Sequence, residues 1–321
     1  MPVLVLIKTS PQALRITRGD ALKGVLEAVY KQKNITLECG KRTVKIDETA
    51  DSVTLHFEDG TSATGDILLG CDGIHSAARL KHVEPERKSV YSGVANAFGF
   101  APRPKNVDVH FECTGINFAR RGMLLTSFHE SSKSSVYVGA LMQVPEIESR
   151  DGWKAAGGDV EKIRADIKDR FKDSAIPVIP ELIETAQDFY LWPVFTLSKG
   201  GKWATERTML MGDAAHAMPP QGESTGIVFE DTVLFARCLC RWMELGRPGT
   251  IKDAFNHYEG MRRARIDVAF EESKEVVKVV SDAGWLGHKI KTLVVPWYLW
   301  WTRTYREKHF IEDVTTSELP F

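Results

Sequence analysis

The stretch RTMLMGDAAHAMPPQGESTGIVFED, residues 207–231, decides the fold that this sequence predicts. The apolar residues at 208–212 are typical of a short buried strand, and Asp213 follows at its carboxyl end, the edge at which α/β folds bind ligands. A long helix is expected to begin near Gly226, and the amino end of a helix offers unpaired N–H groups that attract an anion. The pattern therefore predicts an anion site beside a carboxylate, although a purely structural strand, loop and helix would have the same pattern.

The sequence on either side of this stretch has both helical and strand-like patterns. Residues 15–32 have the apolar spacing of a helix, and residues 44–73 contain short strand-like runs. The dipeptide Asp59-Gly60 between two of these runs is typical of a β-hairpin turn. In residues 90–144, polar turns separate alternating runs, which predicts an antiparallel sheet.

These patterns predict an α/β protein whose first domain is interrupted by a second one. The strand-and-helix patterns lie at both ends of the chain, with the β-rich stretch between them. We therefore predict a split Rossmann-like domain formed by residues 1–88 and 201–321. Residues 89–200 are predicted to form an inserted domain built on an antiparallel β-sheet.

Composition limits the classes of protein to which the chain can belong. Its 321 residues are 43% hydrophobic and 26% charged, which is typical of a folded globular protein. The 42 basic and 43 acidic residues nearly cancel, so nucleic acid is not expected as a partner. The five cysteines have no zinc-ligand spacing, which predicts reduced thiols, no metal site and a cytoplasmic protein. The apolar run at 293–301 is half of a bilayer span, so no transmembrane segment is expected.

Several motifs resemble those of the single-component flavin-dependent aromatic hydroxylases, the family of para-hydroxybenzoate and salicylate hydroxylases. GDAAHAMPP at 212–220, with the acidic pair at 230–231, resembles the family's second FAD-binding motif. DILLGCDGIHSAAR at 66–79 resembles its other internal signature, Asp-Gly-x-x-Ser-x-x-Arg. ITRGDALKGVL at 16–26 and YEGMRRARIDVAFEES at 258–273 resemble helices that lie before and after these motifs. The segments occur in the family's order, which makes the resemblance specific.

The resemblance implies an FAD-dependent monooxygenase of the kind found in secondary metabolism. NADH or NADPH would be the reductant, O2 the co-substrate and a small aromatic or related molecule the substrate. FAD would bind to the split domain and the substrate to the inserted sheet. The residues that the resemblance assigns to FAD are Arg18, Asp72, Gly73, Arg79, Gly212, Asp213, Ser224, Thr225 and Gly226. Those that it places at the catalytic position beside the flavin ring are Pro219, Pro220 and Gly222.

The sequence departs from the family's pattern in two places. No G-x-G-x-x-G, the turn that binds the FAD pyrophosphate in the family, occurs in the 321 residues. The chain is therefore interpreted as either a fragment of a longer enzyme or a natural truncation, and we expect it to bind FAD weakly or not at all on its own. The loop PPQGEST at 219–225 has one glycine fewer than the family's loop, and Ser224 replaces another, which puts the closeness of the flavin contact in doubt.

Other interpretations stay open. A flavin-free descendant that reuses the substrate pocket, as a binding or scaffold protein or for a cofactor-independent reaction, would explain the absent glycine turn. The aromatic cluster at 297–301 could contact a membrane surface, although core packing or a homodimer contact explains it equally well. Residues of the insert that could hydrogen-bond a phenol are His110, His129, Tyr137, Tyr190 and Trp192, although most aromatic residues in strands form core or sheet surface.

Overall fold

The structure, a computed structural model, describes residues 16–109, 111–112, 114–174, 176–220, 224–282, 284–301 and 313–319. Contacts group the chain into two compact units. The sheet unit draws on segments 1–37, 93–194 and 277–310, and the motif unit on segments 38–92, 195–276 and 311–321. Each unit is thus assembled from separate stretches of sequence. The assignment of residues 1–88 and 201–321 to FAD, and of 89–200 to the substrate, stays a prediction.

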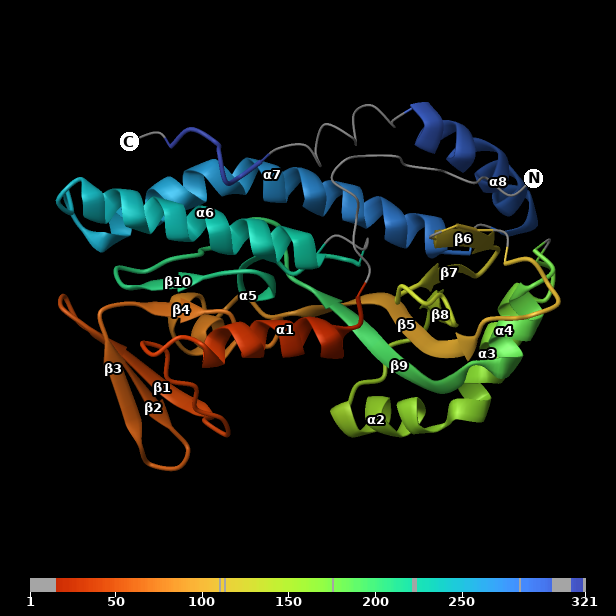
Figure 1. Cartoon of the computed structure of the whole chain (residues 1–321), viewed down its shortest axis with the longest axis horizontal. Coiled ribbons are helices and arrows are strands. Elements are labelled where there is room, and N and C mark those ends of the chain that lie inside the picture. The colour runs from red at the N-terminus through yellow and green to blue at the C-terminus, as the bar shows by residue number, and fades with distance from the viewer. Residues whose placement is uncertain are drawn as a thin grey trace. The chain divides into compact units, whose positions relative to one another are not determined.

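The sheet unit contains a five-stranded sheet with the strand order β6-β7-β8-β5-β9 (Figure 1). Its strands are β5 (Val90–Pro102), β6 (Thr114–Ala119), β7 (Gly122–Phe128), β8 (Ser135–Gln143) and β9 (Gln187–Thr196). The pairs β6-β7, β7-β8 and β5-β8 are antiparallel, which confirms the sheet predicted for residues 90–144. Helices that lie wholly or largely in this unit are α1 (Arg18–Tyr30), α2 (Arg150–Gly158), α3 (Val160–Phe171), α4 (Ile179–Thr185) and α8 (Gly284–Trp301).

One face of this sheet packs against α3 and α4. Because side chains alternate along a strand, Val136, Val138 and Ala140 of β8 all point to this face, and all three are buried. On α3 the buried residues Ile163 and Ile167 are four apart and therefore share one side of the helix. These residues belong to one hydrophobic cluster, which is the core of the sheet unit.

The motif unit begins with the antiparallel strands β1 (Thr43–Glu48), β2 (Val53–Phe57) and β3 (Ser62–Gly65). Gly60, between β2 and β3, has a left-handed φ of +82°, and this turn confirms the hairpin predicted at Asp59-Gly60. The strands β4 (Leu68–Gly70) and β10 (Thr208–Leu210) pair in parallel. The other elements are the π-helical turn η1 (Arg79–Val83) and the helices α5 (Asp213–His216), α6 (Ser224–Glu244) and α7 (Ile251–Val280).

Helices α6 and α7 lie side by side in the motif unit (Figure 1). The ring of Phe235 on α6 lies 5.8 Å from that of Phe255 and 5.5 Å from that of Tyr258, both on α7. Cys238 is buried in the same cluster, whereas Cys240 is exposed, as the helical spacing predicts. Aromatic and aliphatic packing between the two helices therefore forms the core beneath the motifs.

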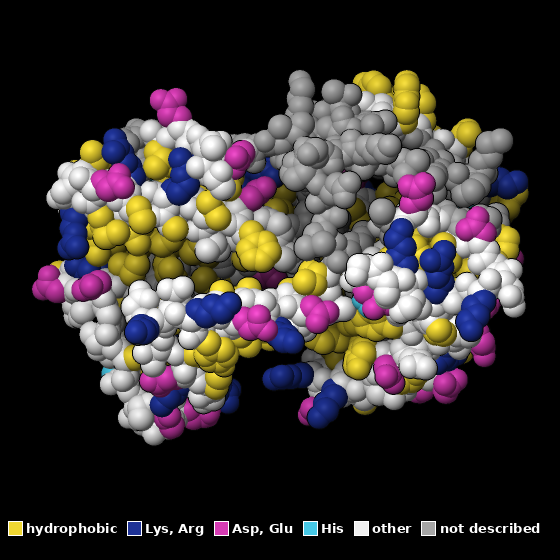
Figure 2. Space-filling view, in the orientation of Figure 1, with side chains coloured by type: hydrophobic (Ala, Val, Ile, Leu, Met, Phe, Trp, Pro, Cys, Tyr) yellow, Lys and Arg dark blue, Asp and Glu magenta, His cyan; other side chains and the backbone are white. Residues whose placement is uncertain are grey.

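Helix α8 contains the aromatic run that the sequence analysis singled out. Its side chains Leu293, Trp297 and Trp300 are exposed, and Figure 2 shows hydrophobic side chains projecting from this helix. The rings of Trp297 and Trp301 stack on each other with centroids 5.8 Å apart. Within the described residues, these aromatic side chains do not belong to either hydrophobic core cluster. No helix in the described part of the chain has the length and hydrophobicity needed to cross a bilayer.

Candidate functional site

The two motifs meet at one edge of the parallel pair β4 and β10. The N–H of Met211 donates to the carbonyl of Gly70 at 3.0 Å and so extends the pairing past the carboxyl end of β10. Asp72 lies two residues after the carboxyl end of β4, and Asp213 lies three residues after the carboxyl end of β10. Both carboxylates therefore lie at the same end of the strand pair. Because α/β folds bind ligands at the carboxyl ends of parallel strands, this edge is the candidate site.

Asp72 uses its carboxylate to hold its own loop. The oxygen Oδ2 accepts the N–H groups of Ala77 at 2.6 Å and of Ala78 at 3.1 Å. Gly73 has a φ of +78°, a backbone conformation that residues with a Cβ rarely adopt. These two residues therefore shape the loop, and direct contact of either one with FAD stays a prediction.

Arg79 links the two motifs from inside the unit. Its guanidinium is fully buried and donates to three carbonyl oxygens, those of Arg87 at 3.0 Å, Ala214 at 2.8 Å and Ile74 at 2.5 Å. Burial lowers the pKa of Arg79, against the opposing effect of nearby carboxylates. Because Nε and both Nη atoms are engaged, the side chain positions the loops, and its direct contact with FAD stays a prediction.

Asp213 is exposed, as Asp72 is, but its carboxylate is not used to hold its own loop. Its side chain is exposed and has no hydrogen-bond partner among the described residues. Although the side chain reaches solvent, desolvation by the surrounding protein raises the pKa of Asp213, and so does the nearby charge of Asp231, against the opposing effect of His216. Gly212 precedes it with a φ of +57°, and a Cβ there would lie 3.0 Å from Cγ2 of Val228. The backbone thus presents a carboxylate that can accept hydrogen bonds from the hydroxyl groups of a ligand.

A buried ionic network fixes the first turns of α6 to α5 and α7. Nε2 of His216 lies 2.9 Å from Oδ2 of Asp231, and Nε of Arg262 donates to Oδ1 of Asp231 at 2.6 Å. Arg262 also donates to the carbonyl of Ile227 at 2.8 Å and to Glu230 at 2.7 Å. Burial raises the pKa of Asp231, but the bonds to His216 and Arg262 outweigh burial and lower the pKa below its ordinary value. Asp231 is therefore a charged anchor inside the unit.

Helix α6 begins at Ser224, two residues before the start predicted near Gly226. The start predicted near Gly226 is thus confirmed to within two residues. Ser224, Thr225 and Gly226 are all exposed. The first turn of a helix carries N–H groups without an intrahelical partner, so these three residues can offer N–H groups to an anion.

The other residues that the resemblance assigned lie in different surroundings. Pro219 is buried and Pro220 is exposed in the loop after α5, and Gly222 lies outside the described residues. Arg18 is the first residue of α1, which groups with the sheet unit. Its contact with FAD stays a prediction, as do the catalytic positions assigned to the loop.

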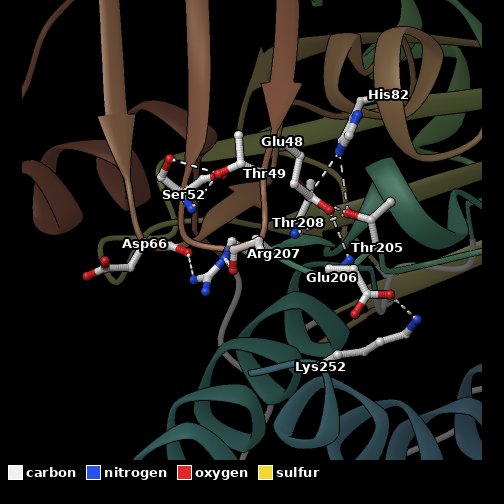
Figure 3. Close-up of polar contacts among 11 residues, drawn as sticks. Glu48, Thr49, Ser52, Asp66, His82, Thr205, Glu206, Arg207, Thr208 and Lys252 are labelled. Carbon is white, nitrogen blue, oxygen red and sulfur yellow. Dashed lines mark hydrogen bonds and ion pairs between the residues drawn. The ribbon is translucent and has the colours of Figure 1, made fainter. Parts of the chain in front are cut away.

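A second polar network, which the sequence did not indicate, joins β1 to the hairpin that leads into β10 (Figure 3). Oε2 of Glu48 accepts the hydroxyls of Thr205 at 2.7 Å and Thr208 at 2.9 Å, and it lies 3.0 Å from Nε2 of His82. Its Oε1 accepts the N–H of Glu206 at 3.1 Å. Burial raises the pKa of Glu48, but these hydrogen bonds outweigh burial and lower the pKa to about 2. The network therefore secures the strand that ends at the candidate site.

The aromatic residues singled out in the insert belong to the sheet unit. Tyr190 and Trp192 lie on β9 and are 48% and 54% exposed. Tyr137 lies on β8, and His129 directly follows β7. His110 lies outside the described residues. These side chains provide a second candidate surface, on the sheet unit, whereas Asp213 belongs to the motif unit.

Comparison with known proteins identifies relatives of the chain. A model of the FAD binding domain matches residues 3–227. The 3-amino-4-hydroxybenzoate 2-monooxygenase of Streptomyces cremeus is 26% identical over 230 residues, which are 71% of this chain and 54% of that protein. The 6-hydroxynicotinate 3-monooxygenase of Pseudomonas fluorescens is 25% identical over 275 residues, which are 85% of this chain and 66% of that protein. The chain thus spans between half and two thirds of the length of these two relatives.

Among solved structures, that of Klebsiella pneumoniae HpxO complexed with FAD and uric acid is similar to this chain. The match covers 87% of this chain and 67% of that chain, with a TM-score of 0.71 and 21% sequence identity. At this identity the likeness shows the fold alone. It confirms the predicted fold class, an α/β fold with a Rossmann-like FAD-binding domain and an inserted antiparallel sheet.

Proposed function

The chain belongs to the FAD binding domain family, and we propose that the protein is an FAD-dependent monooxygenase. The reaction would consume O2 and NADH or NADPH and would hydroxylate a small aromatic or related molecule. Relatives that are named as monooxygenases support this proposal. The observation that carries it is the exposed carboxylate of Asp213, which lies at the ligand edge of β4 and β10 without a partner among the described residues.

The residues at this edge fit the hydroxylated chain and the anionic ring of FAD. When bound, FAD supplies the redox chemistry that activates O2. Asp213 would accept hydrogen bonds from the hydroxyl groups of the cofactor's sugar-like chain. The exposed first turn of α6, from Ser224, would present N–H groups and the positive end of the helix dipole to the negative charge of the reduced ring. Pro219 and Pro220 would keep the loop beside the ring rigid, because proline has a fixed φ and no N–H.

The same proposal divides the chain between cofactor and substrate. Residues 1–88 and 201–321 would bind FAD, and residues 89–200 would bind the substrate. The first assignment is supported by the position of both motifs in the motif unit. The second is supported by the exposed aromatic residues on β9 of the sheet unit.

A cytoplasmic location and a homodimer complete the proposal. NADH and NADPH are intracellular reductants, and the four cysteines that the structure describes are free thiols. The exposed aromatic side chains of α8, such as Trp297 and Trp300, would provide the contact between two copies. Light scattering of the purified protein, with Trp300→Ser as the variant, would measure this association.

Titration with FAD tests the role of Asp213. We expect Asp213→Ala to weaken FAD binding by about 1–3 kcal/mol, or roughly 5- to 150-fold, because hydroxyl groups of the cofactor would lose their acceptor. Quenching of flavin fluorescence measures the dissociation constant. The matched control is Asp51→Ala, which removes an exposed carboxylate from the turn between β1 and β2 and should leave affinity unchanged.

The same titration separates this proposal from its alternative. Equal FAD affinity in the wild type and Asp213→Ala would remove Asp213 from the site. A chain extended by a family-type N-terminal segment that binds aromatic molecules but no FAD at any concentration would instead support the flavin-free binding or scaffold protein. Consumption of NADH or NADPH stimulated by a phenol would establish the monooxygenase.

A further inference from the structure

The five-stranded sheet has a second face, opposite to the one that packs on α3 and α4. On β5 the buried residues Ala97 and Ala101 belong to the core cluster of the sheet unit. Asn96, Phe98 and Phe100 alternate with them and therefore point to the opposite face. They are only partly buried. The sheet thus has one face in the core, and its opposite face is accessible in part, because Val94 and Leu141 on it are buried whereas Phe98 is only partly buried.

Aromatic rings from three neighbouring strands gather on this accessible face. The ring of Phe98 on β5 lies 5.9 Å from that of Tyr137 on β8, 5.5 Å from that of Tyr190 and 6.4 Å from that of Trp192, both on β9. The Phe98 and Tyr137 rings are stacked. We call Phe98, Tyr137, Tyr190 and Trp192 the aromatic platform. Its rings at the β9 edge are about half exposed, so they can still stack with another ring.

Gly139 leaves room for the Tyr137 ring of the platform. It lies opposite Phe98 in the β5-β8 pairing. A Cβ at position 139 would lie 2.4 Å from the hydroxyl of Tyr137 and 2.6 Å from the edge of its ring. The ring of Tyr137 therefore lies across the backbone at Gly139, where any other residue would lift it away from the sheet.

The platform extends over three strands, β8, β5 and β9. Neighbouring strands are about 4.8 Å apart, so its width is about 10 Å. This is wider than one six-membered ring and is comparable with two or three fused rings. A planar ligand with more than one ring would therefore cover more of the exposed aromatic surface than a single ring could.

No charged side chain shares this face on β5, β7 or β8 within the described residues. The register places these residues on it: Val94, Asn96, Phe98, Phe100, Met123, Leu125, Ser127, Tyr137, Leu141 and Gln143. A ligand carboxylate bound flat on these strands would lose water without gaining a cation, which is unfavourable. These three strands therefore favour an uncharged ligand over an anionic one.

One polar side chain beside the platform has unused hydrogen-bonding capacity. The imidazole of His129 lies 4.8 Å from the ring of Phe100, measured between centroids. Both of its ring nitrogens are shielded from solvent and have no hydrogen-bond partner among the described residues. Unpaired buried polar groups are unfavourable, and a ligand hydroxyl or carbonyl would pair with them.

We propose that the aromatic platform selects a planar, uncharged substrate of more than one ring, and that His129 positions it through a hydrogen bond to a hydroxyl or carbonyl group. This rests on the proposed assignment of residues 89–200 to the substrate and specifies which aromatic molecules the site accepts. The platform provides stacking area, and His129 determines the orientation of the ring system. The residues involved all lie in the sheet unit.

Calorimetric titration with 2-naphthol, naphthalene and salicylate tests the selection. We expect the wild type to bind 2-naphthol at least tenfold more tightly than the single-ring, charged salicylate. Trp192→Ala should weaken 2-naphthol binding by about three- to tenfold, because one stacking ring is lost. The matched control is Trp300→Ala, which removes an exposed tryptophan of α8 and should leave binding unchanged. Equal binding of salicylate and 2-naphthol, or unchanged binding by Trp192→Ala, would overturn the selection.

A second comparison isolates His129 from a merely structural effect. The wild type should prefer 2-naphthol to naphthalene, and His129→Ala should abolish this preference while naphthalene binding stays within about twofold. His129→Asn, which retains a hydrogen-bonding side chain, should recover part of the preference. An unchanged ratio of the two affinities in His129→Ala would overturn the positioning role. These titrations need no flavin, so their outcome is independent of whether the protein oxidises NADH or NADPH.

Discussion

At the scale of single residues, the buried side chains of Arg262 and Asp231 are expected to have a large effect on stability. Arg262 is 1% exposed, and its substitution by methionine would leave the carboxylate of Asp231 buried without its cationic partner. We expect Arg262→Met to lower the free energy of unfolding by about 3–5 kcal/mol. Denaturation in urea measures this loss.

A matched arginine provides the control for that prediction. Arg121 forms an ion pair with Asp169, but both side chains are largely exposed. Exposed ion pairs contribute little because water screens them. Arg121→Met should therefore leave the urea midpoint almost unchanged. Similar losses of unfolding free energy in both variants would show that burial does not increase the contribution of the Arg262–Asp231 ion pair to stability.

Glu48 makes stability depend on pH in acid. Its pKa is lowered from 4.5 to about 2 in the folded protein, so the folded state favours the ionised carboxylate. The resulting stabilisation, roughly 3 kcal/mol, is fully present above the unfolded pKa of 4.5. It is lost as the pH falls from 4.5 toward 2.

The variant Glu48→Gln tests this pH dependence. It should be less stable than the wild type at neutral pH, and the difference should shrink as the pH falls below about 4. Urea denaturation at a series of pH values measures the difference. The exposed Glu58, substituted by glutamine, is the control and should give no such trend. A difference that is constant down to pH 3 would contradict the role given to Glu48.

At the scale of elements, the junction between β10 and α5 depends on Gly212. Its φ of +57° is unfavourable for other residues, and a Cβ would lie 3.0 Å from Cγ2 of Val228. Gly212→Ala should therefore destabilise the protein by about 1–2 kcal/mol. Adding Val228→Ala should relieve the close contact but not the backbone strain. Gly24→Ala is the control and should not destabilise the protein, because a Cβ at this position of α1 would meet no other atom and alanine favours a helix.

Local sequence patterns predicted the individual helices, strands and turns well, but they did not predict the side-chain contacts between distant segments. The helix at 18–30, the hairpin at Asp59-Gly60 and the strands of the inserted sheet follow from periodicity and turn residues that lie next to one another in the chain. The candidate site was also predicted from a local pattern, because the strand that ends before Asp213 and the loop that follows it are contiguous in the sequence. By contrast, the bonds from Glu48 to Thr205 and Thr208 join residues more than 150 positions apart. No local pattern contains that information.

At the scale of the whole molecule, the two units carry two different kinds of candidate binding surface, and each unit is built from discontinuous segments of the sequence. The motif unit carries accessible polar groups at the carboxyl ends of β4 and β10, whereas the sheet unit carries an accessible aromatic face. Polar groups of the first kind suit the hydroxyls and negative charge of a cofactor, and stacked rings of the second kind suit a planar apolar molecule. This contrast is the physical basis for proposing that the cofactor binds beside the two motifs and the substrate on the inserted sheet.

Hydrogen exchange can test this assignment over the whole chain at once. A ligand that binds only the native state slows local opening where it binds. FAD should therefore increase the protection of peptides from residues 68–80 and 208–232, and 2-naphthol that of peptides from β5 and β9. The strands β1 to β3 serve as the internal control, since a general stabilisation would protect them equally. Protection by FAD confined to residues 93–194 would mean that the cofactor binds the sheet unit, and the assignment of residues 1–88 and 201–321 to FAD would then be wrong.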